Sequence, residues 1–304
     1  MTTGMVSVVI ATRDRPQMLR EAIEAALAQE HRGDLEVVVV FDQSEPDHTL
    51  ARQAASRSVR VISNTRCAGL AGARNSGVEA SQGEFVAFCD DDDYWLPGKL
   101  ERQLAVLQGA PDAGLVTCGI RVEYDGNTFQ RVLDMDEVPF EELLRDRHTE
   151  LHPSTFLMRR SALLEDIGLV DERVPGGFGE DYELLLRAAK QHPIVNVCDA
   201  LTVVRWGRQS FFFRRWETMA AGLSWLLERY PEFERSPRGS ARIYGQIAFA
   251  YASMGSRRTA LTWAFRALRR RKTEPRAFLA AAVAARVVSP DRVMDTLHRH
   301  GRGI

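Results

Sequence analysis

The strongest constraint on the fold is an alternation of short apolar runs with helical segments over the first 90 residues. Residues 6–11, 35–41, 59–62 and 84–89 are apolar, β-branched runs, typical of strands buried on both faces. Residues 16–29 repeat apolar side chains at helical spacing, and further helices are predicted over 48–56 and over the small-residue segment 69–80. This alternation predicts an α/β fold with a mostly parallel sheet covered by helices on both faces.

Composition agrees with a globular chain that has a sizeable core. The 304 residues are 45% hydrophobic and 27% charged, and the net charge of −1 argues against a general nucleic-acid binder. The cysteines are far apart and lack CxxC spacing, and the N-terminus has no signal-like segment, so we expect a reduced, cytoplasmic protein. No apolar run approaches the length of a membrane span.

Four consecutive acids follow the predicted strand 84–89, namely Asp90, Asp91, Asp92 and Asp93. Such a run is compatible with a solvated acidic loop. It is equally compatible with a cation site, because an apolar strand precedes it and Tyr94-Trp95-Leu96-Pro97 follows it. Carboxylate ligands suit Mn²⁺ or Mg²⁺, especially where phosphate oxygens complete the coordination.

Other polar residues also stand at predicted strand ends. Thr12 and Arg13 follow the first strand and Asp42 follows the second, and ligands of parallel sheets bind outside such ends. This convergence favours the metal hypothesis. Asp42 is suited either to contact with a base or ribose or to a helix N-cap or turn. No GxGxxG or Walker A motif is present, so neither a standard dinucleotide site nor a P-loop is predicted.

The second half of the sheet region carries further candidates. Glu180 and Asp181 open a predicted helix directly after glycines 176, 177 and 179, so they are either helix caps or carboxylates that take a proton from an attacking hydroxyl. Arg205 and Arg208 follow a predicted strand, where they can meet phosphate or remain in a solvated loop. His152 is as compatible with capping or packing as with substrate contact.

In this order, the motifs resemble those of family-2 glycosyltransferases of the GT-A fold. The resemblance runs through most of residues 6–210, about two-thirds of the chain. It is carried by residues 6–13, 36–42 with Ser44, Asn64, 69–70, 73–77, 83–93, 95–100 and 179–181. One departure is Phe41-Asp42-Gln43-Ser44, where the family usually has Asp-Asp-Gly-Ser, so we do not name the nucleobase. Arg205-Trp206 resembles the end of a processive-synthase motif, but Thr202 departs from it, and without membrane spans we reject processive synthesis.

The resemblance implies metal-dependent transfer of a sugar, with inversion, from a nucleotide-diphosphate donor (UDP, dTDP or GDP) to a hydroxyl acceptor such as a glycan, a lipid-linked molecule or a natural-product intermediate. It implies Asp181 as catalytic base and Mn²⁺ or Mg²⁺ on Asp92 and Asp90. The nucleotide pocket would comprise Thr12, Arg13, Asp42, Arg74 and Asp91. Further substrate or diphosphate contacts would come from Glu180, Trp95, His152, Arg205 and Arg208. Two alternatives are an interaction protein with helical repeats and a degenerate GT-A domain, and a sugar-phosphate nucleotidyltransferase.

The last third changes to all-helical character, so we predict a GT-A domain over 1–210 and a helical region over 211–304. The spacing of residues 244–275 resembles one tetratricopeptide-like unit, which cannot bury its own face and should pack against the catalytic domain or a partner. The predicted helix 257–271 is basic at both ends. That basic segment is either a solvated face or a peripheral contact with anionic lipids at the inner face of the membrane.

Overall fold

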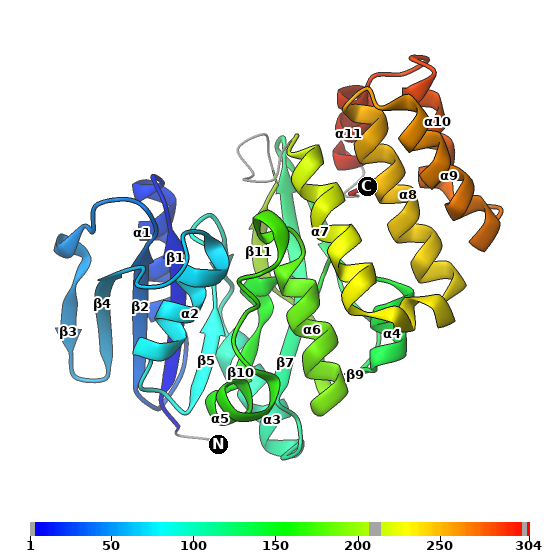
Figure 1. The fold of residues 1–304 in the computed structure, drawn as a ribbon. Coiled ribbons are helices and arrows are strands. Elements are labelled where there is room, and N and C mark those ends of the chain that lie inside the picture. The colour runs from blue at the N-terminus through cyan, green and yellow to red at the C-terminus, as the bar shows by residue number, and fades with distance from the viewer. Residues whose placement is uncertain (1–3, 207–213, 300–302) are drawn as a thin grey trace.

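A mixed, eleven-stranded sheet runs through the computed structural model, which describes residues 4–206, 214–299 and 303–304 (Figure 1). The main strand order is β3-β4-β2-β1-β5-β10-β7-β11-β6, with β8 paired to β7 and β9 to β11. The strands are β1 (Val6–Thr12), β2 (Leu35–Phe41), β3 (Arg52–Ala54), β4 (Arg57–Ser63), β5 (Phe85–Phe88), β6 (Tyr94–Trp95), β7 (Leu115–Tyr124), β8 (Asn127–Arg131), β9 (Glu137–Val138), β10 (Leu157–Arg159) and β11 (Ile194–Arg205).

The parallel core of the sheet sets the position of the site. β1 pairs in parallel with β2 and β5, and β2 with β4, so the carboxyl ends of all four lie along one edge. The register ends with Thr12 opposite Phe41, which places Asp42 beside the end of β1. β10 inserts antiparallel between β5 and β7, while β7 and β11 are parallel. The α/β prediction is therefore confirmed, with one reversed strand inside the sheet.

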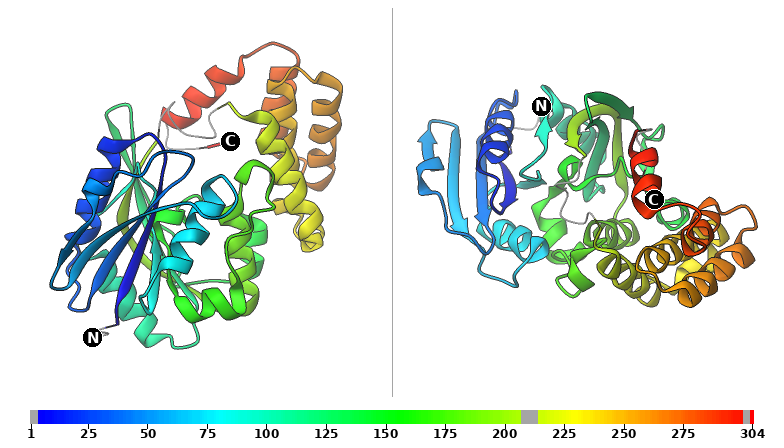
Figure 2. Two further views of the ribbon diagram at one scale, coloured as in Figure 1. Left: turned by 60° about the vertical axis from the view of Figure 1, so that its left-hand side comes forward. Right: turned by 90° about the horizontal axis from the view of Figure 1, so that it is seen from above.

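Helices cover both faces of this sheet (Figure 2). The helices are α1 (Pro16–Leu27), α2 (Leu70–Ala80), α3 (Lys99–Gly109), α4 (Phe140–Arg145), α5 (Arg160–Ala162), α6 (Glu180–Gln191), α7 (Trp216–Arg229), α8 (Pro237–Ser253), α9 (Arg257–Arg270), α10 (Pro275–Ala284) and α11 (Pro290–Arg299). Alternate residues of β1 pack against helices on opposite faces of the sheet, since successive side chains of a strand point to opposite faces. Val8 packs in a cluster with α1 and α3, and Val9 in a cluster with α2 and α6.

Helix α2 lies unusually close to the sheet, as its small residues predict. A Cβ added at Gly77 would lie 2.3 Å from Cγ1 of Val9 and 3.1 Å from Cγ2 of Val40. Only glycine leaves room for this approach. The N-terminus of α2 is thereby held at the carboxyl edge of β1 and β2.

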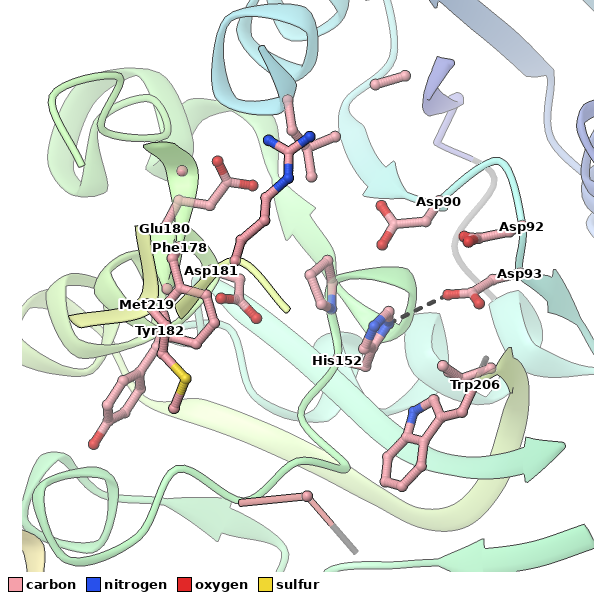
Figure 3. A pocket seen from close by; sticks show the side chains of 18 of the residues that line it. Asp90, Asp92, Asp93, His152, Phe178, Glu180, Asp181, Tyr182, Trp206 and Met219 are labelled. Atoms are coloured by element: carbon pink, nitrogen blue, oxygen red, sulfur yellow. Dashed lines mark ion pairs between the residues drawn. The ribbon is translucent and has the colours of Figure 1, made fainter. Parts of the chain in front are cut away.

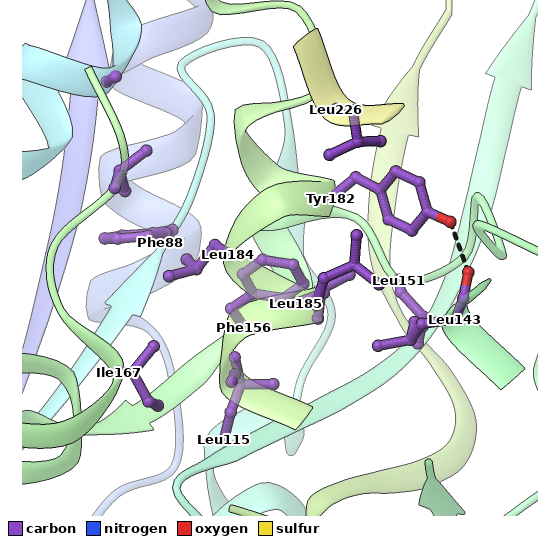
Figure 4. Close-up of a cluster of buried hydrophobic side chains, with 14 of the residues drawn as sticks. Phe88, Leu115, Leu143, Leu151, Phe156, Ile167, Tyr182, Leu184, Leu185 and Leu226 are labelled. Carbon is purple, nitrogen blue, oxygen red and sulfur yellow. Dashed lines mark hydrogen bonds between the residues drawn. The ribbon is translucent and has the colours of Figure 1, made fainter. Parts of the chain in front are cut away.

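The C-terminal helices share a core with the sheet. Met219 and Leu223 of α7 and Ile243 of α8 belong to the same buried cluster as Phe88 of β5 and Leu185 of α6. Figure 4 shows part of this cluster, including the hydrogen bond from the Tyr182 hydroxyl to the carbonyl of Leu143. The helical character predicted after residue 210 is confirmed for the described residues, and the hairpin of α8 and α9 packs against α4, α7 and α10. Among the helices described, none is both long and apolar enough to cross a membrane.

One predicted element is wrong. Residues 48–56 do not form a helix but a short 3₁₀ turn (His48–Leu50) followed by the edge strand β3. Asp47 caps the turn by accepting a hydrogen bond from the amide of Thr49, and β3 then pairs antiparallel with β4. The strand is exposed along its whole length, so its sequence lacks the alternating apolar residues from which a half-buried strand is predicted.

Candidate active site

A cavity of about 740 Å³ opens at the carboxyl edge of the parallel strands. Figure 3 shows Asp90, Asp92 and Asp93 on one side of it, with Glu180 and Asp181 across from them. Most of the residues singled out from the sequence line this cavity together: Thr12, Arg13, Asp42, Arg74, Asp90, Asp91, Asp92, His152, Glu180, Asp181 and Arg205. A further part of the cavity wall comes from the C-terminal region, mainly Trp216, Met219, Leu223, Arg242, Gln246, Met294 and His298.

Asp91 ties the turn after β5 to the end of β1. It accepts hydrogen bonds from the Thr12 hydroxyl at 2.7 Å, the Arg13 amide at 3.4 Å and the Arg15 guanidinium at 2.9 Å. Arg15 also contacts Asp92, with 2.7 Å between Nη1 and Oδ2. Burial and the neighbouring charge of Asp90, with a smaller effect from Asp91, raise the pKa of Asp92 to about 6 although Arg15 opposes the shift. Arg15 thus partly neutralises a run of acids that repel one another.

A second group of acids faces His152. One ligand atom each from Asp90, Asp93 and His152 lie within 4.8 Å of one another, a spacing that suits a shared cation. The Nδ1 of His152 lies 3.3 Å from Asp93, whose carboxylate also accepts from the Ser154 hydroxyl at 2.5 Å. Burial and the charges of Asp92 and Asp90 raise the pKa of Asp93 well above its usual range. A divalent cation would relieve this repulsion, so the donor set fits Mn²⁺ or Mg²⁺.

Arg74 connects the acidic edge with the start of helix α6. Its guanidinium lies 2.5 Å from Asp90 and also forms an ion pair with Glu180. Burial disfavours ionisation of Asp90, but the charge of Arg74, helped by His152 and Arg15, outweighs it and lowers its pKa. Burial raises the pKa of Glu180 to about 8 against the opposing charge of Arg74. The Oε2 atom of Glu180 is buried and has no hydrogen-bond partner among the described residues.

Asp181 stands next to Glu180, in the first turn of α6, and lines the cavity. Gly179, the N-cap residue, takes the left-handed conformation (φ 87°), which glycine adopts at little steric cost. Arg147, from the loop after α4, forms an ion pair with the Asp181 carboxylate.

Asp42 contacts the loop between β4 and α2 and also lines the cavity. Its carboxylate accepts from the side chains of Asn64 (2.8 Å) and Gln43 (3.0 Å) and from the amide of Gly69 (3.1 Å). These hydrogen bonds outweigh burial and lower the pKa of Asp42. Gln43 stands where the family pattern has glycine, and it keeps the backbone that glycine favours, with φ 53°. The departure in sequence therefore leaves a left-handed turn in place.

Trp95 and Arg205, two of the residues predicted to contact the substrate, do not present a free side chain to the described cavity. Trp95 is 3% exposed and does not line the cavity. Its indole donates a hydrogen bond to the carbonyl of Ser154 at 2.8 Å, next to the cavity-lining residues His152 and Pro153. The Arg205 side chain pairs with Glu21 at 2.7 Å, while its amide donates to Asp93 at 3.4 Å. Arg208 lies outside the described residues.

Sequence reasoning missed several residues of the site. Arg15 stands in the same polar turn as Thr12 and Arg13, so the strand-end rule used for those residues also points to it. Asp93 belonged to the acidic run, but nothing in the run distinguishes it from Asp92. Arg147 comes from an irregular loop, and its partner is 34 positions away, so no local pattern signals it.

Solved structures with the same architecture define the class. A fragment of Staphylococcus aureus TarS in complex with UDP-GlcNAc superimposes with a TM-score of 0.61 at 17% identity, covering 98% of this chain and 92% of that one. The mannosyltransferase PcManGT of Pyrobaculum calidifontis, in complex with GDP-Man and Mn²⁺, gives 0.57 at 18% identity, covering 97% and 84%. The fold is that of the GT-A glycosyltransferases.

The sequence itself narrows the class. Residues 7–168, more than half of the chain, match the model of glycosyl transferase family 2, and the protein belongs to that family. It is 30% identical over 105 residues to the Escherichia coli UDP-Glc:alpha-D-GlcNAc-diphosphoundecaprenol beta-1,3-glucosyltransferase WfaP, a match spanning 34% of this chain and 41% of WfaP. An uncharacterised glycosyltransferase of Bacillus subtilis, YwdF, is 26% identical over 200 residues, spanning 63% of this chain and 70% of YwdF.

Proposed function

We propose that the protein transfers a sugar from a nucleotide-diphosphate donor to a hydroxyl group of an acceptor, with a divalent metal ion and with inversion at the anomeric carbon. The observation that carries the proposal is that the aspartates after β5 and Asp181 at the start of α6 face each other across the same cavity. A leaving diphosphate needs positive charge, and an attacking hydroxyl needs a base. The aspartates on one side of the cavity would hold the cation that supplies positive charge, and Asp181 on the other side would act as the base.

The donor would bind along the carboxyl edge of β1, β2 and β5. Asp42 lines the cavity beside the loop that precedes α2. A base or ribose could replace the Gln43 side chain as a hydrogen-bond donor to the Asp42 carboxylate. Thr12, Arg13 and Asp91 form one connected group next to it. The donors seen in TarS and PcManGT carry UDP and GDP, so we include both, with dTDP, among the candidates for this chain.

A divalent ion held by these aspartates would supply Lewis-acid stabilisation of the departing diphosphate. The sequence pattern assigns the ion to Asp92 with Asp90. The geometry adds Asp93 and His152 to Asp90 as a compact set of donors. In the described structure Arg15 contacts Asp92, so this arginine would have to release that carboxylate if Asp92 is a ligand.

Asp181 would remove the proton from the acceptor hydroxyl. Its position across the cavity from the aspartate cluster suits an attack from the face opposite the leaving group, which is the geometry of inversion. Arg147 would hold the carboxylate in place until the acceptor arrives. Holding both substrates in one cavity would itself contribute several kcal/mol, up to roughly 7–11 kcal/mol in favourable cases.

Thermal-shift measurements with UDP, dTDP and GDP, each with and without Mn²⁺, test the donor and metal parts together. Binding to the native state raises the melting temperature through mass action. We expect one nucleotide to stabilise the protein strongly only when Mn²⁺ is present. A nucleotide shift of equal size without the metal contradicts metal dependence, and no shift with any nucleotide contradicts the donor site.

A further inference from the structure

The exposed large hydrophobic side chains of this protein are concentrated on the outermost helical layer. Seven are exposed among the described residues, and five of them fall within residues 254–290: Met254, Leu261, Phe265, Phe278 and Val287. Phe265 is 63% exposed and Leu261 51%. Both belong to α9, which lies at the outer edge of the molecule with α8 between it and the catalytic layer (Figure 1).

Helix α9 and the turn after it carry four cations that pair with no described acid, although Arg270 of α9 pairs with Glu234. The side chains of Arg257, Arg258, Arg269 and Lys272 have no hydrogen-bond or ion-pair partner within the part of the chain that the structure describes. Segment 255–290 contains a single acid, Glu274, which is fully buried. Exposed arginines elsewhere behave differently, since Arg20, Arg102 and Arg173 each pair with an aspartate.

Helical spacing brings the two features onto one face. Arg258, Leu261, Phe265 and Arg269 follow one another at intervals of three, four and four residues, so they share a side of α9. The opposite side packs on the neighbouring helices through the buried residues Ala260, Ala264 and Ala267. The outward face therefore presents two large apolar side chains flanked by arginines.

We propose that this face of α9, with Lys272 just beyond it, docks the protein on an anionic lipid bilayer, namely the inner leaflet that faces the cytoplasm. The arginines and Lys272 would meet lipid phosphates, while Phe265 and Leu261 would enter the boundary between headgroups and acyl chains. A merely solvated basic face explains the charge but not the exposed phenylalanine and leucine between the arginines. Charge complementarity selects the membrane over an uncharged partner.

Co-sedimentation with phosphatidylcholine vesicles, with and without phosphatidylglycerol, tests this proposal on the full chain. We expect binding only to the anionic vesicles, weakening as salt is raised. The triple variant Arg258→Gln/Arg269→Gln/Lys272→Gln should bind them on the order of a hundredfold more weakly, since each cation near such a surface contributes about 1 kcal/mol. The variant Leu261→Ser/Phe265→Ser should also bind more weakly and retain its salt dependence.

A matched control removes the same charge from α1, α3 and the loop before α6. The variant Arg20→Gln/Arg102→Gln/Arg173→Gln, whose arginines are exposed but paired with acids, should bind vesicles like the unmodified protein. Equal binding to uncharged vesicles, or undiminished binding by the α9 triple variant, overturns the proposal. Self-association without vesicles that Leu261→Ser/Phe265→Ser abolishes assigns the face to a second copy and overturns it too. Pelleting does not depend on turnover, so its outcome is separate from that of the nucleotide thermal shifts.

Discussion

Arg74 of α2 and Glu180 of α6 form a buried ion pair across 106 positions of the chain. Both side chains are 3% exposed. Because Arg74 also contacts Asp90, one guanidinium joins the acids at the end of β5 to the helix that carries Asp181. Arg74 thus links the two sides of the cavity.

Replacing Arg74 with glutamine should destabilise the protein by about 3–5 kcal/mol, because the buried Asp90 loses its counter-ion and the buried Glu180 loses its hydrogen-bond donor. Urea denaturation at neutral pH measures the loss. The double variant Arg74→Gln/Glu180→Gln should recover part of it, since the carboxyl that was left unpaired is gone. A single variant as stable as the unmodified protein contradicts the assigned pairing.

Asp181→Asn should reduce sugar transfer by several orders of magnitude while leaving the fold and donor binding intact, because the amide cannot accept the acceptor's proton. Initial rates with a transferable acceptor measure the loss, and the nucleotide thermal shift reports donor binding. Arg147→Gln serves as the companion variant and should lower the rate less, since it removes only the group that holds the base. Near-normal turnover by Asp181→Asn would assign the base elsewhere.

The metal ligands can be separated by titrating Mn²⁺ into Asp92→Asn, Asp93→Asn and His152→Ala and following free Mn²⁺ by electron paramagnetic resonance. If the sequence assignment is right, Asp92→Asn weakens binding most. If the compact set of Asp90, Asp93 and His152 holds the ion, the other two variants weaken it by at least tenfold and Asp92→Asn less. Binding that none of the three changes contradicts both assignments.

Lys99 gives a pH-dependent stability with a defined sign. It is fully buried, 2.8 Å from Oε1 of Gln103 and 3.9 Å from the centre of the Trp95 ring, and burial lowers its pKa from 10.5 to about 8. Between those values the unfolded chain binds the extra proton, so the free energy of unfolding should rise as pH increases from 8 to 10.5. Lys99→Met should remove this rise and add up to about 3 kcal/mol at pH 7, at about 1.4 kcal/mol per pKa unit. Chemical denaturation across this pH range measures both effects.

Gly77→Ala should destabilise the protein by about 1–3 kcal/mol despite the better helix propensity of alanine, because the added methyl meets Val9 at 2.3 Å. Gly109→Ala is its control. That glycine ends α3 with no atom within 4 Å of an added Cβ, so alanine there should be neutral or stabilising by up to about 1 kcal/mol. Thermal unfolding of both variants shows whether close packing or propensity decides.

The strands of the parallel core could be predicted because each is an uninterrupted apolar run, and the residues after them could be placed at one edge by topology alone. The exposed strand β3 could not be predicted, since it has no buried face to impose a pattern. The residues of the site also differ in how far the sequence could predict them. Thr12, Asp42 and Asp90 stand at the ends of strands and line the cavity, whereas the position of Arg147 depends on how a distant loop folds back. The choice between Asp92 and Asp93 depends on side-chain directions that four identical residues cannot encode.

The wall formed by Trp216, Met219 and Leu223 lies beyond residues 7–168, the part of the chain that the family match covers. We expect an acceptor in the cavity to contact this wall, so that donor binding and acceptor choice would depend on separate stretches of the sequence. Family members that share the sheet would then differ in acceptor through substitutions in α7 and α8. For the same reason, a chimera that takes these helices from another family member should change its acceptor and keep its donor.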